Sequence, residues 1–355
     1  MRWTFLVFQA CFALFHVACG SVLAETVELE FNSVALDEAR PILVRLPEGY
    51  EEGGAQRYPV LVVLNEKDNF EWASYIVGLQ ASRGAMDDMF VVGLPATDNY
   101  SGDNYPFAKT GSLELNDRSQ AYSHFIREEA LPYIEQNYRT NGGRFIVGHS
   151  LSGLMVTHMM TQYPDAFSTF IILSPSLQHA PQLLGVLSDF FKTNGPVESQ
   201  AYFALGSLEH ETIQQGFSGL SEVLKADAPD GWSHEQTILA HTDHMLAAFK
   251  GTYDSLAWLY RDFSIPTDRV QAMKASEIID HYARLSRQLN YRLLPRQRGM
   301  TGLGWFLEKR IGNKAAALEV LKAAAHFYPE DEKIKSSVAR LECRSSDNTA
   351  TTCGE

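Results

Sequence analysis

The sequence of 355 residues contains only 4 cysteines and lacks the short motifs that mark common metal and cofactor sites. No HExxH or CxxC segment occurs, and the histidines show no metal-ligand spacing among themselves, so no metal site is predicted. No GxGxxG or GxxxxGK[ST] segment occurs either, which removes the two commonest nucleotide-binding motifs. We therefore expect chemistry that requires neither a metal ion nor a cofactor.

Basic residues are scarce relative to acidic ones, with 30 Lys and Arg against 43 Asp and Glu and a formal net charge of −13. A nucleic-acid ligand would require a clustered positive surface, so it is not expected. The hydrophobic share of 45% and the charged share of 21% are typical of a globular chain. The length exceeds what one core usually organises, which favours a catalytic domain with a smaller appendage.

Long apolar runs are absent apart from residues 3–17, where Arg2 is the only charge before Glu25. This run is shorter than the about 20 residues that a membrane-spanning helix needs. Small residues follow it, and Val22-x-Ala24 suits a cleavage site. We expect a signal peptide over residues 1–24, no integral membrane span, and an exported protein, periplasmic or secreted. Lipidation at Cys19 is the disfavoured alternative.

The cysteines agree with export. Cys11 and Cys19 would leave with the signal peptide, and Cys343 and Cys353 remain in the mature chain. An oxidising compartment permits a disulfide between them. The polar tail over residues 343–355 is also compatible with two free thiols, so both states stay open.

Short apolar runs rich in β-formers recur along the first two thirds of the chain. Long helical patterns separate the later runs, over residues 117–138 and 151–163. Strands that alternate with helices predict a mostly parallel sheet covered on both faces, and so an α/β fold. The predicted strands are residues 27–31, 41–46, 58–64, 90–94, 144–147, 170–173 and 201–205.

The helical pattern over residues 242–263 stops at 264–267, and no strand pattern follows. We therefore expect a catalytic domain over 25–264 and a helical extension over 265–342. Residues 315–329 resemble the second helix of a tetratricopeptide unit. A single unit cannot bury its own apolar face, so we expect it to cap the neighbouring helix or to form a homodimer. The helices expected there are 270–289, 302–310, 314–328 and 333–341.

Ser150 is the candidate nucleophile. It stands between an apolar strand and a strongly apolar helix, in the segment Gly148-His-Ser-Leu-Ser-Gly153. Such a strand–turn–helix forms the sharp nucleophile elbow of α/β hydrolases, which needs small residues on both sides of the serine. A serine hydroxyl is a weak nucleophile and requires a base that a third group orients.

Glu209 is the candidate acid, because it follows a strand and Gly206 at the position where acids of this fold commonly lie. Glu211 competes with it, although a carboxylate in the first turn of the next helix also suits the helix dipole. His244 is the candidate base because it opens a helix after a short strand, whereas His241 still belongs to the strand end. Asp243 suits a helix cap.

The tetrahedral oxyanion needs donors. The amide of the residue after the nucleophile and one amide from the loop after an earlier strand usually supply them. Leu151 and the loop over residues 65–69 meet that description.

These residues resemble the putative-esterase family of α/β hydrolases, which includes esterase D and IroE-like siderophore esterases. The likeness spans residues 27–263, and the helical tail looks like that of exported relatives. It implies Ser150 as nucleophile, Glu209 as acid and His244 as base, with Leu151 and Lys67 supplying the oxyanion amides. The segments that carry the likeness are 58–64, 91–98, 125–135, 148–153, 174–176 and His244.

Two departures from the family pattern stand out. Ser152 replaces the elbow glycine, and Glu66 and Lys67 stand where relatives tend to have Gly-Asp. An acidic side chain beside a developing oxyanion would oppose catalysis unless Lys67 compensates it or both side chains face solvent.

The resulting prediction is a serine carboxylic-ester hydrolase that acts through an acyl-enzyme on a small-molecule or siderophore-like ester. The alternatives are an acyltransferase of the same fold and a catalytically weak, hydrolase-derived binding protein.

Overall fold

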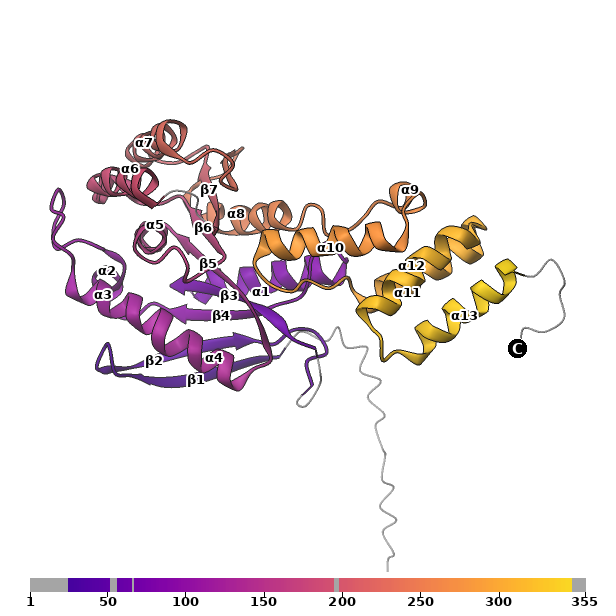
Figure 1. Ribbon diagram of the computed structural model, residues 1–355. Coiled ribbons are helices and arrows are strands. Elements are labelled where there is room, and N and C mark those ends of the chain that lie inside the picture. Colours follow the sequence, from indigo (N-terminus) through magenta and orange to yellow (C-terminus); the bar gives the residue numbers. More distant parts are fainter. Residues whose placement is uncertain (1–24, 52–55, 66, 195–197, 347–355) are drawn as a thin grey trace, which may run out of the picture.

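The computed structural model describes residues 25–51, 56–65, 67–194 and 198–346. One eight-stranded sheet runs through it in the order β1-β2-β4-β3-β5-β6-β7-β8 (Figure 1). β1 and β2 pair antiparallel, β2 is antiparallel to β4, and the remaining pairs are parallel. The prediction of an α/β fold with a mostly parallel sheet is therefore confirmed. The strands are β1 Thr26–Ser33, β2 Glu38–Arg45, β3 Tyr58–Asn65, β4 Phe90–Pro95, β5 Thr140–His149, β6 Thr169–Leu173, β7 Gln200–Gly206 and β8 His234–Leu239.

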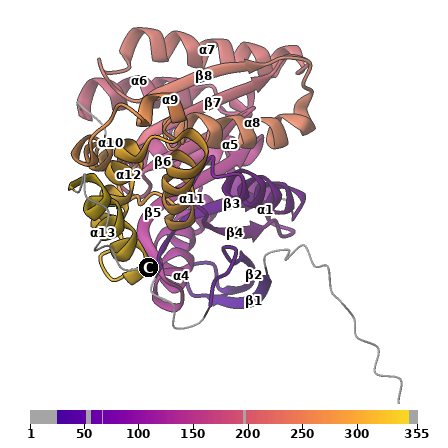
Figure 2. The ribbon, with the colours of Figure 1, turned by 90° about the vertical axis from the view of Figure 1, so that its right-hand side faces the viewer.

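Helices cover both faces of this sheet (Figures 1 and 2). In β3 the side chains alternate between two apolar cores, with Leu61 and Val63 in one and Val60 and Val62 in the other. Burial on both faces explains why the strands read as continuous apolar runs. The helices before residue 264 are α1 Lys67–Ser82, α2 Tyr100–Asn104, α3 Asp117–His124, α4 Leu131–Asn137, α5 Leu151–Gln162, α6 Gln182–Asn194, α7 Glu211–Asp227 and α8 His244–Leu259.

The helix predicted over residues 117–138 is interrupted. A π-helical segment, η1 (Phe125–Ala130), joins α3 to α4. A single-residue change of helical phase leaves an apolar periodicity almost intact, which is why the sequence pattern does not reveal it. A short 3₁₀ turn, η2 (Leu177–His179), follows β6.

The helical extension lies at the amino ends of the parallel strands. Tyr291 packs on Gly143 at the start of β5, where an added Cβ would lie 2.7 Å from the tyrosine ring. The Tyr260 and Tyr291 hydroxyls are 2.7 Å apart, and Tyr282 donates to the Phe263 carbonyl at 2.9 Å. One apolar core continues from β3 and α8 into these helices, so the extension packs on the sheet domain rather than standing apart. Its elements are α9 Thr267–Val270, α10 Ala275–Leu289, α11 Gln297–Phe306, η3 Leu307–Ile311, α12 Lys314–Phe327 and α13 Glu332–Ser346.

Several predictions concern residues on which the structure says little. The predicted signal peptide, residues 1–24, and the end of the tail lie outside the described residues. Cys343 is disulfide-bonded, whereas Cys353, its predicted partner, lies outside them. The tetratricopeptide-like character of residues 315–329 stays a prediction. Among the described helices, none combines the length and the apolar character that crossing a membrane requires.

Candidate active site

Ser150 stands at a strained turn between β5 and α5. Its φ of 60° and ψ of −118° lie in a region that non-glycine residues rarely adopt. The turn is so tight that a Cβ on Gly148 would lie 2.3 Å from the Ser152 carbonyl oxygen. A backbone atom cannot move aside as a flexible side chain can, so only glycine fits at position 148. This geometry presents Ser150 at the carboxyl end of β5.

Ser152, the departure from the elbow glycine, has a structural function in this turn. The His149 amide donates to Ser152 Oγ at 3.1 Å, and Ser152 Oγ donates to the His149 carbonyl at 2.8 Å. The side chain is fully buried at 0% exposure. Since buried backbone groups need partners, the hydroxyl provides one for the amide and one for the carbonyl of His149.

His244 approaches Ser150 from the first residue of α8. Asp243 caps this helix, with its carboxylate accepting from the Leu246 amide at 2.9 Å, as the sequence predicts. His244 Nε2 lies 2.9 Å from Ser150 Oγ. His241, by contrast, is exposed in the turn before the helix, with a φ of 55°.

Glu209 completes the chain of contacts. Its Oε2 lies 2.8 Å from His244 Nδ1, and only 5% of the residue is exposed. Gly206, at the end of β7, allows this approach, because a Cβ there would lie 2.5 Å from the Thr242 carbonyl oxygen. Glu211 is exposed in the first turn of α7, where it accepts from Gln215 at 3.1 Å. The structure therefore brings Glu209, and not Glu211, to the histidine.

The environment favours the ionised form of Glu209. Burial raises the pKa of this carboxyl, but the hydrogen bond to His244 and the neighbouring Ser174 hydroxyl lower it, and the net shift is downward. An ionised carboxylate can only accept, so His244 Nδ1 must carry the proton. His244 Nε2 is then free to accept a proton from Ser150.

A second serine, which the sequence analysis did not assign, contacts the nucleophile. Ser176 Oγ lies 3.2 Å from Ser150 Oγ, and the Ser176 amide donates to the Ser150 carbonyl at 3.0 Å. Ser176 belongs to the segment Ser174-Pro-Ser176, which carries part of the family likeness. That likeness was the available signal, but the segment follows a different strand, so the contact could not be derived from spacing.

The two predicted oxyanion donors begin helices that follow neighbouring strands. Leu151 is the first residue of α5, and Lys67 is the first residue of α1. Both helices start at the same edge of the sheet because β3 and β5 are parallel neighbours. The first amides of a helix have no intrahelical acceptor, so they are available to a ligand. Glu66 lies outside the described residues.

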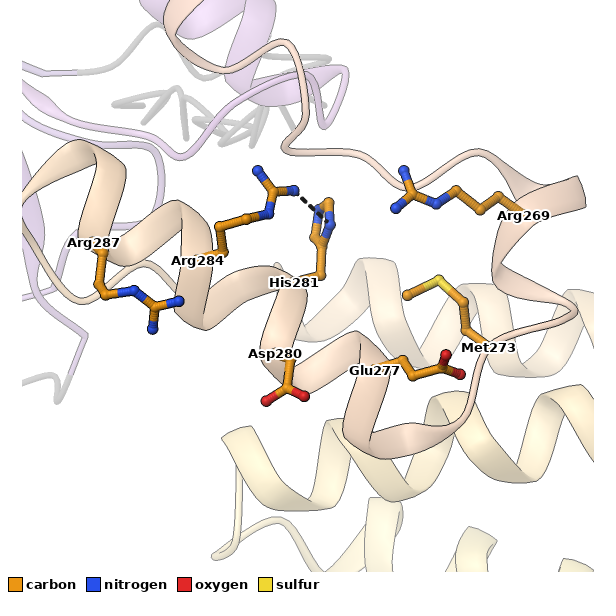
Figure 3. A pocket seen from close by; sticks show the side chains of 7 residues that line it. All are labelled: Arg269, Met273, Glu277, Asp280, His281, Arg284 and Arg287. Carbon is orange, nitrogen blue, oxygen red and sulfur yellow. Dashed lines mark hydrogen bonds between the residues drawn. The ribbon is translucent and has the colours of Figure 1, made fainter. Parts of the chain in front are cut away.

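A surface pocket of about 440 Å³ lies in the helical extension, lined by residues of which none belongs to the Ser150 site (Figure 3). His281 Nε2 donates to the Asp262 carbonyl at 2.7 Å, and Arg284 donates to Nδ1 at 3.2 Å, so the ring is neutral. The charged lining mixes both signs. Its residues are Arg269, Met273, Glu277, Asp280, His281, Arg284 and Arg287. Within the described chain, no group of three or more His, Cys, Asp or Glu could hold a metal ion.

The sheet, the elbow and the order serine–acid–histidine define an α/β-hydrolase. A sequence model of the family described as putative esterase matches residues 33–236. Because this match covers more than half of the chain, the protein belongs to the putative esterase family.

Curated relatives match less than half of the chain. Ferri-bacillibactin esterase BesA of Bacillus subtilis (strain 168) is 28% identical over 176 residues, which is 43% of this chain and 60% of the relative. Uncharacterized protein YjcH of the same organism is 28% identical over 155 residues, 42% of this chain and 60% of the relative. The chain thus spans 60% of the length of these relatives.

Solved structures extend the likeness of the fold. An IroE-like serine hydrolase from Shewanella oneidensis superposes with a TM-score of 0.74 at 22% identity, covering 86% of this chain and 99% of that one. Siderophore hydrolase EstA from Aspergillus nidulans gives a TM-score of 0.57 at 17% identity, covering 74% of this chain and 99% of that one. At such identities the likeness shows a common fold.

Proposed function

We propose that the protein is a serine carboxylic-ester hydrolase that acts through an acyl-enzyme. The observation that carries this proposal is the continuous chain from Glu209 through His244 to Ser150, with contacts of 2.8 and 2.9 Å. His244 takes the Ser150 proton as the hydroxyl attacks the ester carbonyl, and then returns it to the leaving alcohol. Water repeats the sequence on the acyl-enzyme. Glu209 holds the required tautomer of His244 and stabilises the imidazolium that forms.

The negative charge of the tetrahedral intermediate falls at two helix starts. The Leu151 amide at the start of α5 and the Lys67 amide at the start of α1 are the proposed donors. The α5 dipole adds a partial positive charge at the same place. Lys67 is exposed, which suits the expectation that its side chain faces solvent and only its amide serves the site.

The proposed substrate is a small-molecule or siderophore-like ester. This choice is supported by the name of the relative BesA, a ferri-bacillibactin esterase, and by the fold that the protein shares with siderophore hydrolase EstA. A panel that includes a siderophore trilactone, a feruloyl ester and p-nitrophenyl acetate tests it. A kcat/KM for the trilactone no higher than for p-nitrophenyl acetate would argue against siderophore-like substrates.

A fluorophosphonate probe tests the enzymatic proposal directly. The wild type should form a covalent adduct at Ser150, whereas Ser150→Ala should not react. Ser176→Ala is the matched control, because the Ser176 hydroxyl of the wild type lies 3.2 Å from Ser150 Oγ but is not the proposed nucleophile. This variant should therefore still form the adduct at Ser150. An inert wild type would leave the weak, hydrolase-derived binding protein as the better description.

Acyl transfer to an alcohol is the second candidate reaction, because the same acyl-enzyme can be attacked by an acceptor other than water. Product analysis with an added acceptor alcohol distinguishes the two. If the acceptor ester forms in place of the free acid at low acceptor concentration, the protein is an acyltransferase.

We also propose that the helical extension forms a homodimer. Large apolar side chains are exposed on it, with Trp305 at 54%, Phe306 at 40% and Ile311 at 47% exposure. Light scattering of the wild type should give a dimer that Trp305→Glu dissociates. A monomeric wild type would overturn this proposal.

Export is the proposed localisation, and it rests on the sequence pattern of residues 1–24 alone. Fractionation of expressing cells, with mass spectrometry of the amino terminus, should find a chain that begins at Glu25.

A further inference from the structure

His149, the residue before the nucleophile, contacts the proposed base. Its side chain is buried, with 6% of the residue exposed, and its Nε2 lies 2.7 Å from the His244 carbonyl oxygen. A carbonyl oxygen only accepts, so His149 Nε2 carries the proton and donates it. The two residues are 95 positions apart, and this bond ties the elbow to the first turn of α8.

The two imidazole rings also lie against each other. Their centroids are 4.6 Å apart, with an angle of 44° between the ring planes. Glu209 is hydrogen-bonded to Nδ1 of His244, and Ser150 to Nε2. His149 adds two further interactions, a ring contact with the His244 imidazole and a hydrogen bond to the His244 carbonyl. The base is therefore held through its side chain and its main chain.

Ser152 in turn holds His149. Its hydroxyl bonds the amide and the carbonyl of His149, at 3.1 and 2.8 Å. The contacts run in series from Ser152 to the His149 backbone, and from the His149 side chain to the His244 carbonyl. The serine that departs from the elbow glycine is thus the first link of this series.

The His149 ring stays neutral beside the proposed base, His244. Burial lowers the pKa of His149 to about 4 and the charge of His244 acts in the same direction, whereas the hydrogen bond to the His244 carbonyl and the charge of Glu209 act against them. These are the titratable groups that face His149. A neutral ring does not add a second positive charge beside the imidazolium that forms on His244.

We propose that Ser152 and His149 form a brace that positions His244 for proton transfer, with His149 as a positioning residue rather than a catalytic one. This inference rests on the proposed hydrolase function. The hydrogen bond from His149 Nε2 to the His244 carbonyl is the link on which it depends. A misplacement of about 1 Å in a general base can cost up to roughly a hundredfold in rate.

Two substitutions of His149 separate the hydrogen bond from packing. His149→Leu removes the donor, and kcat for p-nitrophenyl acetate should fall about tenfold or more with KM unchanged. His149→Gln places an amide N–H at the same reach as Nε2, so it should restore most of the lost kcat. Ser152→Ala should give a smaller loss of the same kind.

His158→Leu is the matched control. His158, in α5, is also a buried histidine, with 1% of the residue exposed. Burial lowers its pKa to about 4, as it does for His149. It contacts Gln120 and not His244. It should lose as much unfolding stability as His149→Leu while keeping the wild-type kcat.

The outcomes separate the two proposals. An active wild type with equal kcat in His149→Leu, or equal losses in the Leu and Gln variants of His149, would overturn the brace and leave the hydrolase proposal standing. A wild type that neither turns over the ester nor reacts with a fluorophosphonate overturns the hydrolase proposal, and with it the brace.

Discussion

The two edges of the parallel sheet are built differently. At the carboxyl edge, backbone lies directly against backbone, as at Gly148 and Gly206, and Ser150, Ser174 and His241 all have positive φ angles. At the amino edge, side chains of the helical extension pack on the strands, as Tyr291 does on Gly143. Three of the positive-φ residues thus lie at the edge that carries the proposed chemistry, and Asn290, which caps α10 beside Tyr291, is one at the other edge. The other edge is held by ordinary apolar packing, so we expect the two edges to respond differently to mutation.

The largest expected contrast is in activity. Glu209→Gln should lower kcat by roughly 10² to 10⁴, because an amide no longer enforces the required tautomer of His244 or stabilises its imidazolium. Glu211→Gln is the matched control two residues away, and it should leave kcat unchanged, since Glu211 is exposed and contacts Gln215. Steady-state kinetics of the two variants measures the difference. Equal losses would return Glu211 to consideration as the acid.

Adding one methyl group at the elbow and one in the helical extension should change the free energy of unfolding in opposite directions. Gly148→Ala should cost about 3 kcal/mol or more, because the Cβ would lie 2.3 Å from a backbone oxygen. Gly302→Ala in α11 has open space around it and should stabilise the protein by about 0.5–1 kcal/mol. Denaturant unfolding measures both. A soluble Gly148→Ala variant of wild-type stability would show that the elbow is not strained as described.

Acid should destabilise the fold through two buried histidines, His149 in the elbow and His158 in the second half of α5. The pKa values of His149 and His158 are lowered to about 4 in the folded protein, against an ordinary 6.5. Between those pH values the unfolded chain binds more protons, so stability falls as the pH drops from 6.5 to 4, by up to about 3 kcal/mol for each residue. The urea midpoint should depend less steeply on pH across this range in His158→Leu than in the wild type. An unchanged slope in that variant would contradict a neutral, buried His158.

The smallest effect should come from an ion pair of the extension. Arg340 donates to both carboxylate oxygens of Glu308 at 2.7 Å, and this pairing, together with Lys309, lowers the pKa of Glu308 to about 2. Arg340→Ala should cost about 1 kcal/mol, since the pair is partly exposed and Lys309 still contacts Glu308 at 2.9 Å. The loss should be present above pH 4.5 and should vanish as the pH falls toward 2. The kcat should not change, and a lowered kcat would mean that the extension reaches the active site.

Much of this protein could be predicted from local patterns. Apolar runs separated by amphipathic stretches indicate an α/β sheet because a strand buried on both faces has no polar positions. Ser150 stands out because the elbow needs glycine at 148 and a strand and a helix on the correct sides, all within ten residues. Asp243 is recognisable as a cap for the same local reason.

Contacts between distant segments were decided only by the tertiary structure. The choice of Glu209 over Glu211 depends on how the turn after β7 meets the turn before α8, which Gly206 permits. Ser176 and the bond from His149 to His244 depend on β5, β6 and β8 ending at the same edge of the sheet, with β7 between the last two. Sequence records spacing along the chain, whereas a hydrogen bond between residues 95 positions apart depends on the sheet order and on close packing. For this protein, the nucleophile and candidates for its base and acid could be named from local position, whereas the contacts that join Glu209, His244 and Ser150 are a property of the fold.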